Sequence, residues 1–376
     1  MPSFLALATL APAQATDQAP QPGPPPPSAA QPKAALDWFR RADALTNIRL
    51  PGSAPFHLKV AFHAYPASEL ASPDTSVMIT GDGTCEETWV SPEQWRREIK
   101  FGAYHAIEVR ANGVRKFQST ADYEPLRVML LLRAILEPIP RYTLEPALFP
   151  HPPKWTIEQR TAGAIAYTHI THQQSVAAAE VATALDAFDF LPGGIPVRSE
   201  QETVINTWQD DTVFAGKIVP GRVTVAAMTR PLVEATIAIE PLAHADPAAF
   251  DLPGGPASPA VTLRPLIGYT RRSGEALNAS SVPAASLLDG PVGTGFWIEL
   301  SIDRQRIPRE WEVIDTQPVF PDISKAPLAY RKYVSIFQSA VQHLRYSPAL
   351  MDNDPCQDIG IWVVVKTSNS GSFFAH

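Results

Sequence analysis

The sequence predicts a mostly β, α+β protein: a large curled antiparallel sheet with an inserted apolar helix, followed by a small α+β domain. Between residues 54 and 240, apolar and polar residues alternate with a period of two over many short segments, which is typical of half-buried antiparallel strands. One segment among them, 124–136, is apolar on most of its surface and fits a buried helix. A Pro/Gly/Ser-rich linker, 256–291, then precedes a second α+β pattern at 292–369.

Length and charge narrow the classes of protein that fit. A chain of 376 residues is too long for one ordinary core, so roughly two domains are expected. The formal net charge of -7 and the lack of any Lys/Arg-rich run argue against a nucleic-acid partner.

The first residues resemble an export signal. A short apolar run, Phe4 to Leu10, precedes an Ala-x-Ala pattern that ends at Ala15, although no basic residue precedes the run. The run is shorter than the roughly 20 apolar residues that span a membrane. We therefore predict an export-signal-like segment over 1–15 and a stiff Pro-rich spacer over 16–33.

The large domain is expected to begin with a short amphipathic helix over 34–45, because apolar residues recur there at helical spacing. Gly81-Asp82-Gly83 is interpreted as a turn or bulge, and Asn112-Gly113 as a tight hairpin turn. Strands are predicted over 56–63, 77–79, 84–90, 94–101, 105–110 and 114–118.

The helix over 124–136 is expected to end at Pro138 and Pro140. Further strands are predicted over 155–159, 165–171, 181–185, 196–206, 212–219, 222–228 and 232–240. So long a succession of strands must curl and cover its inner face, and a helix lying in the curl does this economically. Facing that concavity, the candidate ligand-binding residues are Leu131, Leu132, Ile135 and Trp95.

The C-terminal part has its own order of elements. A strand is expected where Phe296, Ile298, Leu300 and Ile302 alternate with polar residues. A second strand over 311–316, a helix over 325–344 and a final strand over 358–366 follow.

A first resemblance concerns the large domain. The segment Thr84 to Glu98 resembles the two-strand centre of the LolA/LolB-like family of lipoprotein-sorting proteins, and Asp246 to Gly255 resembles the family's closing segment. The resemblance covers roughly 34–255. It implies an unclosed β-barrel, or half-barrel, whose apolar concave side is lidded by helices and holds acyl chains in the sorting proteins. It carries over no catalytic or ligand residue.

A second resemblance, to the TonB C-terminal domain, covers roughly 292–369. It rests on the strand after Gly295, the helix, and the tag Leu344-Arg345-Tyr346-Ser347-Pro348-Ala349 before the last strand. The first turn, at 303–306, lacks the glycine of the family pattern. The resemblance implies a sheet edge offered to a partner peptide, and the candidate partner-binding residues are Ile361, Val363 and Val365.

The chain carries none of the common catalytic motifs. There is no Gly-x-Ser-x-Gly elbow, phosphate loop, Cys-x-x-Cys or His-Glu-x-x-His. His169 and His172 would point to opposite faces of a strand, whereas His57 and His63 would share a solvent face. We therefore predict no enzyme, no cofactor and no metal site.

Two adjacent acidic pairs and two cysteines complete the set of candidate residues. Glu86-Glu87 and Asp210-Asp211 point to opposite faces of a strand or lie in a turn, so neither makes an acid/base pair. Cys85 and Cys356 are compatible with an interdomain bridge or with two unpaired thiols, and unpaired thiols are the simpler interpretation.

The sequence thus favours a non-enzymatic periplasmic protein of a diderm envelope, whose half-barrel binds a lipid or acyl chain and whose TonB-like domain docks an envelope or outer-membrane protein. One alternative is a structural or interaction protein whose concavity is filled by its own helix 124–136. Another is a TonB-family energy transducer to an outer-membrane receptor, which requires a further membrane helix upstream.

Overall fold

A computed structural model describes residues 31–66, 80–145, 155–174, 184–252, 258–259, 295–317, 349–365 and 372–375, apart from short gaps at 112–113, 122, 202–203, 228–229, 304, 352–353 and 357. It also describes positions 328, 331–332, 335–336 and 343. The export-signal-like segment and the strand expected over 77–79 lie outside these residues, as do most of the spacer and the linker. Among the described residues, no helix combines the length and apolar character needed to span a membrane.

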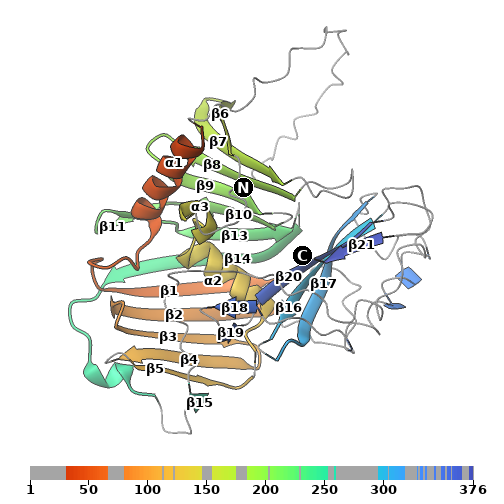
Figure 1. The fold of residues 1–376 in the computed structure, drawn as a ribbon. Helices are drawn as coiled ribbons and strands as arrows, with labels where there is room; N and C mark the ends of the chain where they lie inside the picture. The colour runs from red at the N-terminus through yellow and green to blue at the C-terminus, as the bar shows by residue number, and fades with distance from the viewer. Residues whose placement is uncertain are drawn as a thin grey trace, which may run out of the picture.

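A single large antiparallel sheet dominates the fold (Figure 1). It has 13 strands in the order β15-β5-β4-β3-β2-β1-β14-β13-β10-β9-β8-β7-β6. Their bounds are β1 Phe56–Ala64, β2 Gly81–Ser91, β3 Gln94–Phe101, β4 Tyr104–Ala111, β5 Val114–Ser119, β6 Thr156–Ala162, β7 Ile165–Gln174, β8 Ala184–Leu191, β9 Ile195–Gln201, β10 Val204–Gln209, β13 Arg222–Ala227, β14 Arg230–Pro241 and the short β15 Ser258–Pro259. The prediction of a mostly β protein built on a large antiparallel sheet is confirmed.

The large sheet is less curled than the sequence predicted. Its end strands, β15 and β6, do not pair with each other, and the sheet is neither closed nor strongly curled. The expected half-barrel is therefore more open than the alternation of residues suggested. The alternation tells which face is buried, whereas the degree of curl depends on how the strands pair and twist.

The alternating pattern itself is confirmed along β1, where every second residue from Phe56 to Ala64 is buried. This strand pairs with β2 on one side and with β14 on the other, so it joins the first strands of the sheet to the last. The predicted solvent face of His57 and His63 is confirmed, because neither side chain is buried.

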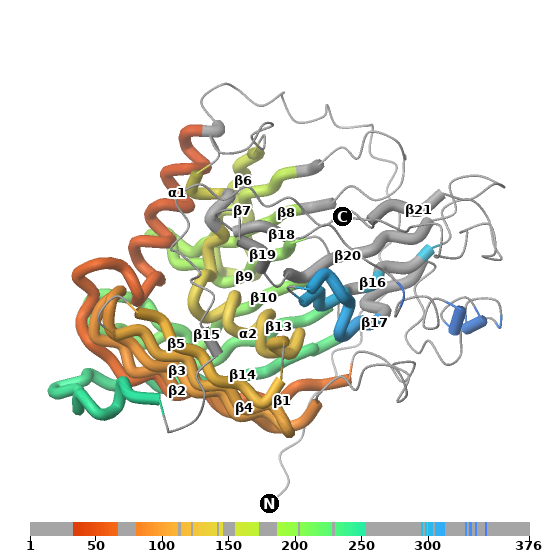
Figure 2. The backbone as a smooth tube through the Cα atoms, turned by 60° about the horizontal axis from the view of Figure 1, so that its bottom comes forward, coloured from red at the N-terminus to blue at the C-terminus, as the bar shows by residue number. Residues whose placement is uncertain are grey.

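Two helices cover the large sheet from one side. Helix α1 (Gln31–Thr46) packs Phe39 against Phe188, Phe190 and Trp155, over the end of the sheet that holds β6 to β9. Helix α2 (Leu126–Leu136) packs over β13 and β14 (Figures 1 and 2). Both helices were predicted at nearly these bounds. A short helix, α3 (Arg141–Leu144), follows α2.

The other face of the sheet carries a smaller apolar cluster. The 3-10 helix η2 (Pro247–Phe250) places the buried Phe250 against Ile107 and Val109 of β4. The side chain of Asp246 caps it by accepting a hydrogen bond from the amide of Ala248 at 2.9 Å. The segment singled out as a closing motif therefore packs on the outside of the sheet.

Three segments differ from the predicted elements. The strand expected over 196–206 is a hairpin of β9 and β10, and that over 212–219 is a separate hairpin of β11 (Thr212–Phe214) and β12 (Lys217–Val219). The expected turn at Gly81 to Gly83 is instead the first part of β2. Gly83 serves packing here, since a Cβ atom at this position would lie 2.2 Å from Cζ of Phe62.

The C-terminal residues form a second antiparallel sheet of four strands in the order β17-β16-β20-β21. Its strands are β16 (Gly295–Ile302), β17 (Pro308–Gln317), β20 (Asp358–Val365) and β21 (Ser372–Ala375). The three predicted strands are confirmed, whereas β21 and the small hairpin of β18 (Ala349–Met351) and β19 (Asp354–Cys356) were not foreseen. Most of the predicted helix over 325–344 lies outside the described residues.

We predict that Gly83→Ala destabilises the large sheet by about 1–3 kcal/mol, because the added methyl group overpacks the ring of Phe62. Urea unfolding monitored by circular dichroism measures the change. Thr84→Ala, at the exposed next position of β2, is the matched control and should change the stability little. Equal stability of the two variants would contradict the close packing at Gly83.

Candidate functional site

The candidate site is the face of the large sheet that α2 covers. Nine of the eleven residues of α2 are buried. The predicted ligand-binding residues Leu131, Ile135 and Trp95 are brought together in one apolar cluster, and Leu132 packs against it half-buried. In this conformation they contact other side chains of the core and do not line an open cavity wide enough for a lipid.

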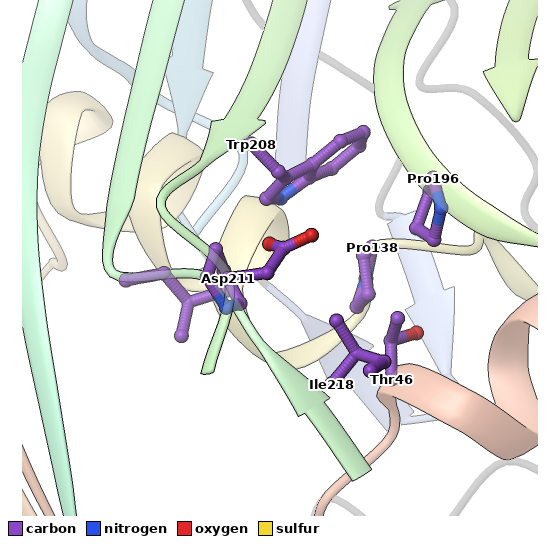
Figure 3. Close-up of a pocket in the computed structure, with 8 residues that line it drawn as sticks. Thr46, Pro138, Pro196, Trp208, Asp211 and Ile218 are labelled. Carbon is purple, nitrogen blue, oxygen red and sulfur yellow. The ribbon is translucent and has the colours of Figure 1, made fainter. Parts of the chain in front are cut away.

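A small pocket lies beside the C-terminal end of α2 (Figure 3). Its lining comes from the end of α1, the end of α2 and the neighbouring strands and loops: Thr46, Ile135, Pro138, Pro196, Trp208, Asp211, Ile218 and Pro220. The cavity volume is about 10 Å³, room for roughly one water molecule. This pocket is too small to hold an acyl chain.

Hydrogen bonds tie both ends of α2 to its surroundings. Near its C-terminal end, Trp208 Nε1 donates to the carbonyl oxygen of Ala134 at 2.8 Å. At its N-terminal end, Pro125 provides no side-chain cap. The amide of Leu126 instead donates to the carboxylate of Glu310, and the guanidinium of Arg127 pairs with Glu312. Both glutamates belong to β17 of the C-terminal sheet.

These contacts with β17 were missed because the two sheets were predicted as separate domains. A signal was nevertheless present in the sequence. Arg127 stands near the start of a helix whose other charged residue, Arg133, is exposed, whereas the side chain of Arg127 is 1% exposed. Glu310 and Glu312 share one side of a strand, and both are buried. Charges in such places require a partner, but the sequence does not say that they are each other's partners.

A row of charges crosses the α2 side of the sheet from strand to strand. Glu87 of β2 accepts from Arg97 Nε of β3 at 2.8 Å and lies 3.1 Å from Arg49 Nε. Arg97 also lies 3.8 Å from Glu108 of β4, which pairs with Arg115 of β5. The register explains the row, since Glu87, Arg97 and Glu108 stand directly opposite one another on neighbouring strands.

Burial makes this row electrostatically strong. Burial alone would raise the pKa of Glu87, but Arg49 and Arg97 outweigh it and hold the pKa below its ordinary value. The guanidinium of Arg49 also stacks on the rings of Trp89 and Trp95, at 4.9 and 5.0 Å from their centroids. Within the described part of the chain, Arg97 Nη2 and Trp89 Nε1 are buried donors without an acceptor.

This face also carries a cysteine and a pair of adjacent glutamates. The thiol of Cys85 lies in the same core, and burial raises its pKa to about 12, so it stays protonated and poorly nucleophilic. Glu86 and Glu87 point to opposite faces of β2, as predicted. The described residues contain no cluster of three or more side chains that could hold a metal ion.

As predicted, His169 and His172 do not come together. His169 of β7 is buried and pairs through Nδ1 with Asp189 of β8 at 2.6 Å, whereas His172 lies beside Trp155. Asp189 in turn lies 3.6 Å from Arg198 of β9. The row is therefore a set of polar contacts between neighbouring strands of the sheet.

The predicted edge strand of the C-terminal sheet is wrong. Ile361, Val363 and Val365 lie on β20, which pairs with β16 on one side and, over Trp362 to Val365, with β21 on the other. Their strand is therefore interior to the sheet at Val363 and Val365. The prediction failed because residues 372–375, which form β21, were not recognised as a strand.

Comparisons with known proteins give only weak structural likeness. No protein-family model matches this chain, and no curated protein matches it. Among solved structures, a LolA superfamily protein from Nitrosomonas europaea matches with a TM-score of 0.31 and 11% sequence identity, over 58% of this chain and 97% of that chain. The chain is thus a weak structural neighbour of that protein, and none of these findings supports a TonB-like domain.

We predict that Glu87→Gln destabilises the protein by about 2–3 kcal/mol, because it leaves the partly buried Arg49 and Arg97 beside a neutral partner. Chemical unfolding at neutral pH measures the loss. Glu86→Gln changes the same side chain one position away, on the exposed face, and should cost less than about 1 kcal/mol. Similar losses in the two variants would argue against a buried ionic row.

We further predict a pH effect from Asp211, whose pKa is raised by burial and by the neighbouring Asp210. An acid with a raised folded-state pKa contributes stability that is complete below its ordinary pKa and is lost as the pH rises through the folded-state value. Asp211→Asn should therefore raise the melting temperature slightly at neutral pH, with the gain disappearing in acid. The exposed Asp251→Asn is the control, and a gain that persists in acid would contradict the assignment.

Proposed function

We propose that this protein is a non-enzymatic binding protein that takes up an apolar ligand, an acyl chain or lipid, on the α2-covered face of the large sheet. The single observation that carries this proposal is the position of helix α2 on the large sheet. One 11-residue helix, with polar contacts at both ends, covers the apolar cluster on the middle of the sheet.

In this proposal the apolar ligand takes the place of the α2 side chains on the sheet. Burial of apolar area contributes about 25 cal/mol per Å² and has no directional requirement. An acyl chain can therefore replace the side chains of α2 on the sheet with little net loss. The polar contacts at the ends of α2 are directional, so they set the free energy that uptake must supply.

The proposed setting is the periplasm of a diderm envelope. Its support is the signal-like segment over 1–15 and the resemblance of 34–255 to lipoprotein-sorting proteins. Docking of an envelope protein by the C-terminal sheet belongs to the same proposal. The edges available in that sheet are β17 and β21, which each pair on one side only within the described residues.

A second candidate function is that of a structural or interaction protein whose interior is filled by α2. The observation that favours it is the size of the pocket in Figure 3, which holds roughly one water molecule. The two candidates differ in whether α2 leaves the sheet when an apolar ligand is offered.

Titration with a fluorescent fatty-acyl probe separates the two candidates. We expect the purified full chain to bind the probe, and Leu131→Arg to weaken binding about tenfold or more, a loss of roughly 1.4 kcal/mol, because it places a charge in the apolar cluster. Ile165→Arg, at a position 58% exposed on β7, is the matched control and should bind normally.

Folding of both variants is checked by circular dichroism, since Leu131→Arg also tests the core. Absence of probe binding by the wild type, together with absence of co-purified lipid in mass spectrometry, would favour the second candidate.

A further inference from the structure

The N-terminal end of α2 is held from outside the large sheet. Three residues of β17, Arg309, Glu310 and Glu312, contact the first turn of α2 or the residues just before it. The guanidinium of Arg309 lies 5.9 Å from the ring of Tyr123, the carboxylate of Glu310 accepts from the amide of Leu126, and Glu312 pairs with Arg127. In Figures 1 and 2, β16 and β17 lie next to α2.

The pair of Arg127 and Glu312 is the strongest of these contacts. Both carboxylate oxygens of Glu312 accept from Arg127, with 2.6 Å between Nη2 and Oε2. Arg127 also donates to the carbonyl oxygen of Tyr65, just after β1, at 3.1 Å from Nη2. The side chains of Arg127 and Glu312 are 1% and 0% exposed. One guanidinium thus joins β1, α2 and β17 without solvent.

The contact at Glu310 replaces a missing helix cap. The first amides of a helix need acceptors, and a negative charge there is favourable to the helix dipole. Pro125 supplies no side-chain acceptor. Glu310, 184 positions away in sequence, supplies one to Leu126. The first turn of α2 therefore obtains both its cap and its charge partner from the C-terminal sheet.

We propose that the C-terminal sheet is a latch for α2, and that displacement of β17 releases this helix from the face of the large sheet. Without β17, Arg127 keeps the carbonyl oxygen of Tyr65 but loses the carboxylate of Glu312, and the amide of Leu126 loses the carboxylate of Glu310. A guanidinium is too costly to leave buried in that condition. The start of α2 then moves toward water, and the apolar cluster beneath it opens.

This latch rests on the proposed function only for the chemical class of the ligand that reaches the α2-covered face. It assigns to the C-terminal sheet a role inside the molecule, the control of access to the α2-covered face. The competing view is that the two sheets are simply joined, so that weakening their contact separates them and leaves α2 in place. The two views differ in what happens to α2 and to the sheet residues of its core.

Cys85 is a native probe of opening. Its thiol is buried on the α2 side of β2, in the same cluster as α2. In a Cys356→Ser background it is the sole thiol, because the chain has two cysteines. Its reaction with a maleimide then measures how often this face opens, since the rate follows the open population when closing is fast.

We expect Glu312→Gln in this background to accelerate labelling of Cys85 by roughly tenfold or more, because it removes the charge that pairs with Arg127. Hydrogen exchange should accelerate at the α2 amides and stay slow at β1 and β14. Glu240→Gln, which breaks the exposed pair with Lys59, is the matched control and should label as the wild type does.

The double variant Arg127→Met with Glu312→Met removes both charges and leaves neither unpaired. Its labelling should return close to the wild-type rate, because apolar residues of similar size can replace a buried ion pair. If Glu312→Gln does not fold, Arg127→Lys, which keeps the charge but loses the two-point contact, is measured in the same way.

Two results would overturn the latch. In the first, Glu312→Gln labels and exchanges at α2 at the wild-type rate. In the second, α2, β1 and β14 accelerate together, which means that the variant acts on the fold as a whole. Failure of the proposed function is a separate result: labelling that responds to Glu312→Gln in a chain that binds no acyl probe keeps the latch and rejects the ligand class.

Discussion

The structure depends on one constraint: the apolar face of a large open sheet must be kept from water. Residues of β1, β2, β3, β13 and β14 build that face, and α2 covers its middle while α1 covers the far end. Hydrophobic burial holds α2 there without specifying its position closely. The hydrogen bonds at its two ends, with Trp208 and with β17, are directional and therefore fix the position of α2 on the sheet.

The same face of the large sheet carries a row of charged side chains beside its apolar cluster. The row from Arg49 to Arg115 crosses four strands beside Trp89 and Trp95. Paired in this way the charges stabilise one register of the sheet, since a slip by one residue would bury them unpaired. The apolar cluster and the ionic row are therefore two neighbouring parts of one surface, and α2 covers the first.

Much of the fold was predictable from local pattern. Helices at 34–45 and 124–136 and most strands were predicted near their observed bounds, because side-chain period is a property of each segment alone. The errors fall where a distant residue decides. Gly83 was interpreted as a turn, although the ring of Phe62 explains it, and Val363 was placed on an edge that β21 covers.

Local patterns of residues were enough to predict most of the core-facing positions, the burial of α2, and the meeting of Leu131, Ile135 and Trp95 in one cluster. Only the tertiary structure decided that the sheet stays open and that β17 holds the first turn of α2. The reason is physical. Arg127 and Glu312 each need a partner, but they stand 185 positions apart, and only the docking of the two sheets makes them partners.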